Sequence, residues 1–506
     1  METTALSMLP PIITIVLALL TKEVYLSLIV GIFAGAMLFT GGNFLQAILT
    51  FFEIMSMKIG DNVNILAFLV ILGILVAAIT RSGATRAYGE WARRTIAGKK
   101  SALGVTALLG ILIFIDDYFN CLTVGTVMRP VTDKFKIARA KLAYVIDSTA
   151  APICIIAPVS SWAAAVGSSL PEGSLIDGFA LFLQTIPFNL YAILTMIFMA
   201  FIVVTERDFA TMGKVVRDNA KEFKIPDEYK DAVKDEMNLG GNGKIIDLVL
   251  PLAVLISVCI YGMLYTGGIH DGKSVADAFA DCDAAQSLVF GAFIALIFIS
   301  VLYLPRKVIT FSEFCDCFAQ GFKAMVPAIF ILCLAWTLSG VCSGKYLNLG
   351  GYVGEIVQNN LSIAVFLPVI FFLVAIALAF ATGTSWGTFG ILIPICMSIL
   401  VNLPADDAAN LLVICIAAIL SGSVGGDHAS PISDTTILAS AGAQCNHLEH
   451  VETQVPYVIT VSACCIVGFL AAGFTQNGWL GLATALACLI LVMFVVKTKV
   501  SPPADS

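Results

Sequence analysis

The sequence has 506 residues, of which 59% are hydrophobic and only 12% are charged. A typical soluble domain carries about 25% charged residues, so this composition excludes a soluble enzyme, a nucleic-acid-binding protein and a disordered chain. The net charge of -7, from 28 basic and 35 acidic residues, identifies no binding partner. The composition therefore predicts an all-α polytopic membrane protein.

A helix that crosses a bilayer needs about 20 mainly apolar residues. In chain order, the expected transmembrane helices, about eleven, are 5–21, 24–40, 65–80, 142–165, 179–204, 246–265, 286–304, 325–342, 409–440, 456–475 and 479–496. Two further apolar stretches, 102–133 and 363–401, are interrupted near their middles by polar residues. Each is either two crossings or a re-entrant hairpin, and we favour hairpins because the polar residues lie at the tips.

Basic residues predict the orientation, because cytoplasmic loops are enriched in Lys and Arg. Segments 81–100 and 134–141 carry six and four of them and flank the first interrupted stretch, whose ends are therefore expected inside. No basic residue flanks the second stretch, so its ends are expected outside. Continuing the alternation gives an outside N-terminus and a cytoplasmic C-terminus, with 24 of the 28 basic residues inside. Two full crossings per stretch would give the same sidedness.

Three short similarities recur in register between two parts of the chain: 27–33 with 287–293, 123–125 with 388–390, and 157–160 with 430–433. They indicate two diverged halves of opposite orientation, and inverted repeats with broken helices are a feature of secondary transporters. The expected organisation begins with an N-terminal span in 1–23 and a first repeat in 24–165, which contains hairpin 102–133 and broken helix 142–165. Connecting spans in 166–285 follow, with a cytoplasmic loop at 205–244. The second repeat, 286–440, contains hairpin 363–401 and broken helix 409–440, and C-terminal spans with a cytoplasmic tail occupy 441–506.

Polar residues at membrane depth gather in the two hairpin tips and in the broken spans that follow them. Non-helical backbone and ionisable groups are costly at that depth, which favours a functional role. The candidate ion- or substrate-binding residues are Asp116, Asp117, Asn120, Thr123, Ser148, Thr149, Thr382, Thr384, Ser385, Asp427, His428, Ser430, Ser433 and Asp434. Hard cations prefer oxygen ligands. The candidate sodium ligands are accordingly Asp117, Asn120, Ser148, Thr384, Asp427, Ser430 and Asp434.

A buried carboxylate can hold either a proton or a sodium ion, so this set predicts exchange of the two. The same residues also have structural explanations, as members of polar networks or as helix caps. Asp147 lies close to the cytoplasmic end of its span, so a role at the surface is equally expected. His447 and His450 are expected to form a solvated or pH-sensing cluster in a cytoplasmic loop.

The segment 426–436, which reads GDHASPISDTT, resembles the signature of the NhaC family of Na+/H+ antiporters, in the ion transporter superfamily. Segments 116–118, 147–150 and 445–457 fit that family too. The resemblance covers nearly the whole membrane part. It implies sodium–proton antiport across a bacterial inner membrane, with Asp427, Ser430 and Asp434 as functional positions. Similar proteins carry small organic acids or amino acids, so a coupled transporter of such a solute remains the alternative.

The expected partners are sodium, protons, membrane lipid and a second copy of the chain in a homodimer. No organic cofactor and no nucleic acid are expected. A GxxxxGKS pattern at 267–274 lies in a short outside loop, not between a strand and a helix, so we expect no nucleotide either. We found no nucleophile–base motif, and an enzyme is not expected.

Overall fold

The computed structural model describes residues 5–21, 23–170, 178–221, 243–275, 278, 282–349, 352, 361–400 and 405–500. Within these ranges all regular structure is helical. Eight of the described helices are long and apolar enough to cross a membrane, or up to nine if a pair bent by 118° counts as one span. The predicted class, an all-α polytopic membrane protein, is confirmed. The expected span 142–165 is divided into shorter helices.

The N-terminal part contains one apolar helix that the sequence analysis did not include, and a short basic helix, 84–95, in the segment expected as a cytoplasmic loop. The elements are η1 (Ala5–Met8), α1 (Leu9–Thr21), α2 (Val24–Phe39), α3 (Phe44–Asp61), α4 (Val63–Arg81) and α5 (Ala84–Thr95). The unexpected apolar helix is α3, which begins where the Asn43 side chain accepts a hydrogen bond from the backbone N–H of Gln46. It turns back from α2 through the 118° bend.

The first interrupted stretch and the span after it are both broken near the expected positions. They form α6 (Lys99–Leu112), α7 (Asp117–Lys134), α8 (Arg139–Ser148), α9 (Ala151–Cys154) and α10 (Ser161–Gly167). The helices α6 and α7 pack against each other and against α8. The break at 113–116 therefore lies at the tip of a helical pair.

The connecting region contains α11 (Gly178–Thr185), η2 (Ile186–Phe188), α12 (Leu190–Thr205), α13 (Ala210–Lys221), α15 (Ile246–Thr266) and η5 (Ile269–Asp271). Two long helices, α17 (Ala284–Tyr303) and α18 (Phe311–Cys342), follow at the start of the expected second repeat. Of the expected cytoplasmic loop, 205–221 and 243–244 are described and 222–242 lie outside the described residues.

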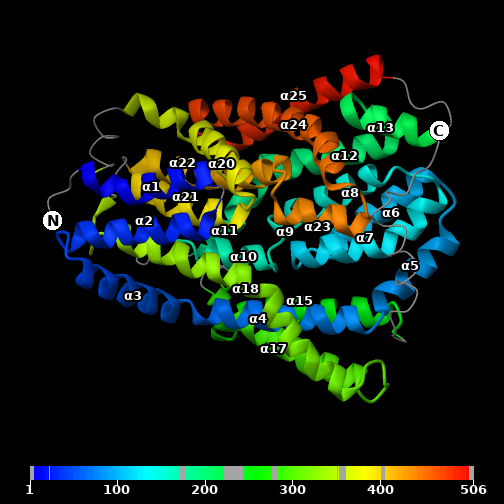
Figure 1. Ribbon diagram of the computed structural model, residues 1–506, viewed down its shortest axis with the longest axis horizontal. Helices are drawn as coiled ribbons and strands as arrows, with labels where there is room; N and C mark the ends of the chain where they lie inside the picture. The colour runs from blue at the N-terminus through cyan, green and yellow to red at the C-terminus, as the bar shows by residue number, and fades with distance from the viewer. Residues whose placement is uncertain are drawn as a thin grey trace.

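The second half repeats the pattern of a helical pair followed by a broken span. It contains η6 (Leu361–Phe366), α20 (Leu367–Thr382), α21 (Ser385–Leu400), α22 (Ala405–Ala429) and α23 (Asp434–Ala443), followed by α24 (His447–Thr475) and α25 (Gly478–Lys499). Figure 1 shows α6, α7 and α8 in the half of the long axis that holds the C-terminus, and α20, α21 and α22 in the half that holds the N-terminus.

The two halves interlock where α7 crosses α23. A Cβ atom added to Gly125 of α7 would lie 2.4 Å from the backbone carbon of Gly442, so the two helices touch backbone to backbone. Two buried arginines secure the end of α23, because Arg129 donates to the carbonyl of Gly442 at 3.2 Å and Arg139 to that of Gln444 at 3.1 Å. Such donors satisfy carbonyls that a helix C-terminus leaves open.

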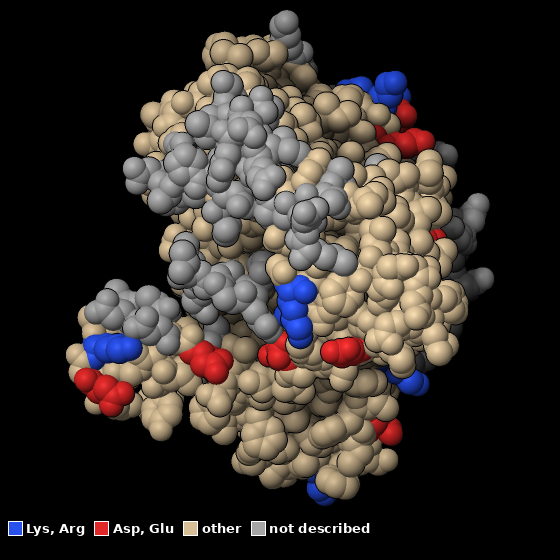
Figure 2. Space-filling model, turned by 90° about the vertical axis from the view of Figure 1, so that its left-hand side faces the viewer, with Lys and Arg blue, Asp and Glu red and all other residues tan. Residues whose placement is uncertain are grey.

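Basic side chains favour one end of the molecule. The helices α5 and α13, each with three Lys or Arg residues, lie toward the C-terminal end in Figure 1. Figure 2 looks at the opposite end, where few Lys and Arg side chains are visible.

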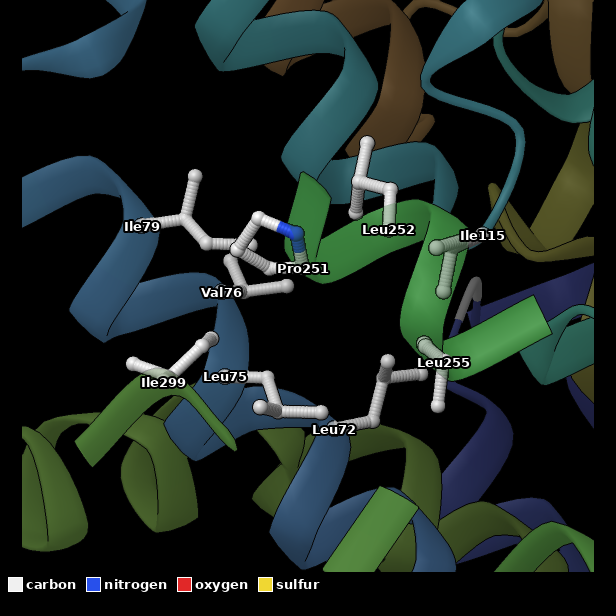
Figure 3. A pocket seen from close by; sticks show the side chains of 9 residues that line it. All are labelled: Leu72, Leu75, Val76, Ile79, Ile115, Pro251, Leu252, Leu255 and Ile299. Carbon is white, nitrogen blue, oxygen red and sulfur yellow. The ribbon is translucent and has the colours of Figure 1, made fainter. Parts of the chain in front are cut away.

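A small cavity of about 10 Å³ lies beside the first hairpin tip, between α4, α15 and α17 (Figure 3). It is lined by Leu72, Leu75, Val76, Ile79, Ile115, Pro251, Leu252, Leu255 and Ile299. Because every one of these side chains is apolar, the cavity offers a cation no side-chain ligand.

Candidate functional site

Both broken spans restart on a serine that caps the next helix. The Ser160 hydroxyl accepts the N–H of Ala163 at 3.1 Å ahead of α10. The Ser433 hydroxyl accepts the N–H of Thr436 at 3.2 Å ahead of α23. Each cap satisfies one of the backbone donors that a helix start leaves open. The sequence similarity of 157–160 with 430–433 aligns these two serines, and their local roles are the same.

The residue after each serine ties the broken span to the hairpin tip of its own half. The N–H of Ser161 donates to the carbonyl of Ile115 at 2.8 Å, and the N–H of Asp434 donates to that of Gly383 at 3.4 Å. Gly383 has a φ of +67°, and a Cβ atom there would lie 2.3 Å from the carbonyl oxygen of Ile432. Glycine alone suits this position. The tips and the breaks therefore meet.

Asp427 is held by the tip of the second hairpin. It lies in the last turn of α22, and its side chain is 1% exposed. The hydroxyl of Ser385, the first residue of α21, is 2.8 Å from Asp427 Oδ2 and 3.2 Å from the carbonyl oxygen of Ser423, and it donates to these acceptors. Asp427 Oδ1 has no hydrogen-bond partner among the described residues. Thr384, beside Ser385, is buried and accepts the N–H of Gly387 at 3.4 Å.

Asp434 is held by the tip of the first hairpin. The Tyr118 hydroxyl donates to Asp434 Oδ2 at 2.5 Å, across a sequence separation of 316 residues. Asp117 and Tyr118 are the first residues of α7, and Asp434 is the first residue of α23. Asp116 and Asp117 are buried, and Asp117 Oδ1 has no partner among the described residues. The positive end of a helix dipole favours a carboxylate at each of these helix starts.

The described Lys and Arg side chains do not neutralise the charge of Asp117, Asp427 and Asp434. In the described part of the chain, Asp117, Asp427 and Asp434 form no ion pair with Lys or Arg. Other buried carboxylates have such partners; Lys141 lies 2.6 Å from Asp208, for example. Removing a carboxylate from water without compensation costs several kcal/mol. The site therefore needs protons or a bound cation.

Asn120 fastens the first hairpin. Its amide nitrogen donates to the carbonyls of Gly110 at 2.7 Å, Ile113 at 2.9 Å and Thr149 at 2.9 Å. These carbonyls belong to α6, to the tip that follows it and to the break after α8. Asn120 thus joins the hairpin to its broken span, and its Oδ1 atom has no partner among the described residues.

Several of the predicted hydroxyl groups are engaged with the backbone. Thr149 and Thr382 each donate to a carbonyl four residues earlier, at 2.9 and 2.7 Å, and Ser430 donates to the carbonyl of Phe380 in α20 at 2.7 Å. Thr123 and Ser148 are buried, and the Ser148 hydroxyl has no partner among the described residues. A hydroxyl that donates keeps lone pairs, so these bonds leave oxygen available to a cation.

A second buried polar cluster surrounds Asp147, which is fully buried although the sequence favoured a surface position equally. Asp147 Oδ2 accepts from the Thr436 hydroxyl at 3.1 Å and from Gln454 Nε2 at 2.5 Å. The Nε2 atom of His450 lies 3.5 Å from Oδ2, and that of His428 lies 3.8 Å from Oδ1. The expectation of a solvated His450 is wrong, because its side chain is 0% exposed.

The same cluster holds the end of α22. Gln454 also donates to the carbonyl of His428 at 2.9 Å, and the Tyr191 hydroxyl lies 3.2 Å from His428 Nδ1. His447 is half-buried, and its Nε2 atom is 2.7 Å from the carbonyl oxygen of Pro431. The helices α8, α12, α22, α23 and α24 therefore converge around the break that separates Asp427 from Asp434.

The donor set suits a hard monovalent cation better than a transition metal. Among the described residues, no three His, Cys, Asp or Glu side chains are grouped so that they could hold a metal ion. The polar groups at the tips and breaks are carboxylates, hydroxyls, an amide and backbone carbonyls. Oxygen atoms of these kinds are the ligands that hard cations prefer.

Comparisons with known proteins identify the family of the chain. Residues 153–474 match the profile of the Na+/H+ antiporter family. An uncharacterized protein of Haemophilus influenzae is 38% identical over 510 residues, which cover 97% of this chain and 95% of that protein. The malate-2H+/Na+-lactate antiporter of Bacillus subtilis is 30% identical over 185 residues, 35% of this chain and 37% of that protein. The YdaH transporter of Alcanivorax borkumensis, a solved structure, is 13% identical with a TM-score of 0.41, over 88% of this chain and 89% of that one.

Proposed function

Because the chain belongs to the Na+/H+ antiporter family, we propose that Asp427 and Asp434, with Asp117 beside them, form the site at which it exchanges sodium for protons. One observation carries the proposal: Asp117 and Asp427 are buried, Asp434 is half-buried, and none pairs with Lys or Arg in the described part of the chain. A proton or a sodium ion can each neutralise such a carboxylate. Because both use the same oxygen atoms, binding of one favours release of the other.

Sodium would bind to oxygen atoms from both hairpin tips and from the second broken span. Asp427 Oδ1 and Asp117 Oδ1 accept no hydrogen bond among the described residues and are the first ligands that we assign. The Ser385 hydroxyl contacts Asp427, and Thr384 precedes it in the chain; we assign both hydroxyls as neutral oxygen ligands. Three further ligands remain predictions from the sequence alone: Ser148, Asn120 and Ser430.

The exchange requires that the site open to one side of the membrane at a time. We assign the mobile unit to α6–α10 and α20–α23, and the scaffold to the remaining helices. Support comes from the matched serine caps and from the matched backbone bonds of Ser161 and Asp434 to the two hairpin tips. These matches favour the repeat boundaries 24–165 and 286–440. Inverted repeats that rock around a central site are the usual basis of alternating access.

The chain is a multi-pass membrane transporter, and its orientation is part of the proposal. The basic helices α5 and α13 lie at the end where the C-terminus is, which favours a cytoplasmic C-terminus and an outside N-terminus (Figure 1). Location in a bacterial inner membrane and assembly as a homodimer stay predictions.

The test uses purified protein in liposomes with a preset pH gradient and a pH dye trapped in the lumen. Addition of NaCl, but not of choline chloride, should collapse the gradient. Asp427→Asn and Asp434→Asn should abolish this response. Asp247→Asn is the matched control, because Asp247 is as buried as Asp427 but contacts Arg306, and it should retain the exchange. Sodium-dependent proton flux in both site variants would refute the assignment.

A small organic acid is the second candidate cargo. The malate-2H+/Na+-lactate antiporter matches 35% of this chain. The N-terminal end of a helix favours negative charge, so the helix starts at this site can bind the carboxylate of an organic acid as well as the carboxylate of a side chain. The same liposomes distinguish the two: a response that appears only after malate, lactate or an amino acid is added with NaCl would favour the organic cargo.

A further inference from the structure

Tyr118 is the one side chain from the first hairpin tip that reaches a carboxylate of the second half in the described contacts. Its hydroxyl donates to Asp434 Oδ2 at 2.5 Å, and the ring is half-buried. Tyr118 is not among the ligands predicted from the sequence. The bond joins the first turn of α7 to the first turn of α23.

The second hairpin makes an equivalent contact. Ser385, in the first turn of α21, donates to Asp427 Oδ2 at 2.8 Å. Each hairpin thus offers one neutral hydroxyl to one carboxylate oxygen. A hydroxyl hydrogen on a carboxylate oxygen supplies part of the stabilisation that a cation would supply there. A hydroxyl hydrogen and a cation therefore compete for that carboxylate oxygen, although the lone pairs of the hydroxyl itself remain able to bind a cation.

We propose that Tyr118 sets the sodium affinity by occupying Asp434 Oδ2 when no cation is bound. This inference rests on the proposed function of Asp434. Sodium binding displaces the hydroxyl from Oδ2 and so releases the tip of α7 from the start of α23. Tyr118 is in this sense a positioning residue, which links occupancy of the site to the position of the first hairpin.

The backbone contact below this bond makes the link effective. Gly125 and Gly442 hold α7 and α23 backbone to backbone two turns further along α7. The crossing of α7 and α23 at Gly125 and Gly442 therefore stays in place while the Tyr118–Asp434 hydrogen bond forms or breaks. Loss of that bond lets the tip move about the crossing.

The test compares Tyr118→Phe with Tyr457→Phe in liposomes. Tyr457 is the matched control, because its hydroxyl also donates to a carboxylate oxygen, Asp208 Oδ1, at 3.0 Å but away from the site. We expect Tyr118→Phe to lower the sodium concentration for half-maximal exchange by about tenfold, the size of one hydrogen bond to a charged group, without raising the maximal rate. Tyr457→Phe should leave it unchanged. The half-saturating sodium concentration is measured on the alkaline side of the pH–rate profile, where protons compete least with sodium.

Three results would overturn the inference. An unchanged half-saturating sodium concentration in Tyr118→Phe would mean that the hydroxyl does not occupy the site. A higher one would mean that the hydroxyl is a sodium ligand instead of a competitor. An equal decrease in Tyr457→Phe would mean that the effect is not specific to Asp434.

Two further measurements separate this inference from the proposed function. If the unaltered protein shows no sodium-dependent flux, the proposed function itself fails. If it shows flux and Tyr118→Phe does not fold, sodium-induced thermal stabilisation of the unaltered protein is measured against that of Asp434→Asn. Stabilisation that survives Asp434→Asn would also refute the role of Tyr118, because sodium would then bind elsewhere.

Discussion

Replacing Gly383 by alanine tests the contact between the second hairpin tip and the second broken span. Gly383 has a φ of +67°, and an added Cβ would lie 2.3 Å from the carbonyl oxygen of Ile432. The left-handed backbone costs an L-residue about 1–2 kcal/mol. A contact this short forces a backbone shift that costs a further ~1–3 kcal/mol. We therefore expect Gly383→Ala to lower the free energy of unfolding by about 2–5 kcal/mol.

Two other glycines separate the two contributions. Gly41 has a φ of +63° with nothing within 4 Å of its Cβ position, so Gly41→Ala carries the backbone cost alone. At Gly426, where no positive φ is recorded, a Cβ would lie 2.3 Å from the carbonyl oxygen of Ile376, so Gly426→Ala carries the contact cost alone. Thermal and denaturant unfolding of the three purified variants in one detergent provides the comparison. The exchange assay then shows whether the shift also disturbs Asp434, whose N–H bonds to Gly383.

Two outcomes of the comparison between these glycine variants would contradict the reasoning. If Gly383→Ala is no less stable than Gly41→Ala, the tip does not press on Ile432, and the backbone bond from Asp434 to Gly383 has no structural basis. If Gly383→Ala is destabilised by about the sum of the other two but exchanges sodium normally, the contact exists and the site tolerates its displacement. That second result would refute the placement of Asp434 by the hairpin tip.

Three further predictions concern the surrounding framework. Asn120→Leu removes the donor to three buried carbonyls and should lower the free energy of unfolding by about 1–3 kcal/mol, measured by thermal unfolding. An unchanged stability would mean that Asn120 does not join the first hairpin to its broken span. Lys141→Met leaves Asp208 buried without its cation and should cost about 3–5 kcal/mol, part of which the double variant Lys141→Met/Asp208→Asn should recover; a double variant less stable than the single one would count against the pair. Asp147→Asn weakens the bonds that hold the break between α22 and α23, and should lower the initial exchange rate at least about tenfold with the fold retained, whereas a normal rate would exclude a positioning role.

The class of the protein and the places where its helices break could be predicted from the sequence. Composition sets the class, and the breaks carry local signals, such as Gly383 and Pro431 next to hydroxyl residues. The helix α3 was missed because Glu53 and Lys58 interrupt an otherwise apolar stretch, and a linear criterion treats such a stretch as a loop.

The contacts that give the site its chemistry could not be predicted in the same way. Tyr118 meets Asp434 across 316 residues, and Asp147 meets Gln454 across 307. No local pattern encodes such a meeting, because it depends on how α7 and α8 pack against α23 and α24. Asp147 was judged by its position along one helix, near an end, although four other helices cover it. Gln454 carried no local signal either, because it lies within the single helix α24, just before the expected span 456–475.

The buried arginines at the end of α23 have a consequence for biosynthesis. Arg129 and Arg139 emerge from the ribosome 313 and 305 residues before the carbonyls of Gly442 and Gln444 to which they donate. At roughly 5–20 residues per second, that interval lasts roughly 15 to 60 s. During this time the two arginines lack these carbonyl acceptors, although Arg139 can already pair with Asp133, 2.9 Å away in the finished structure. The assembly of the first half is completed only when the second half inserts, so a chain truncated before α23 should be a target for quality-control proteolysis.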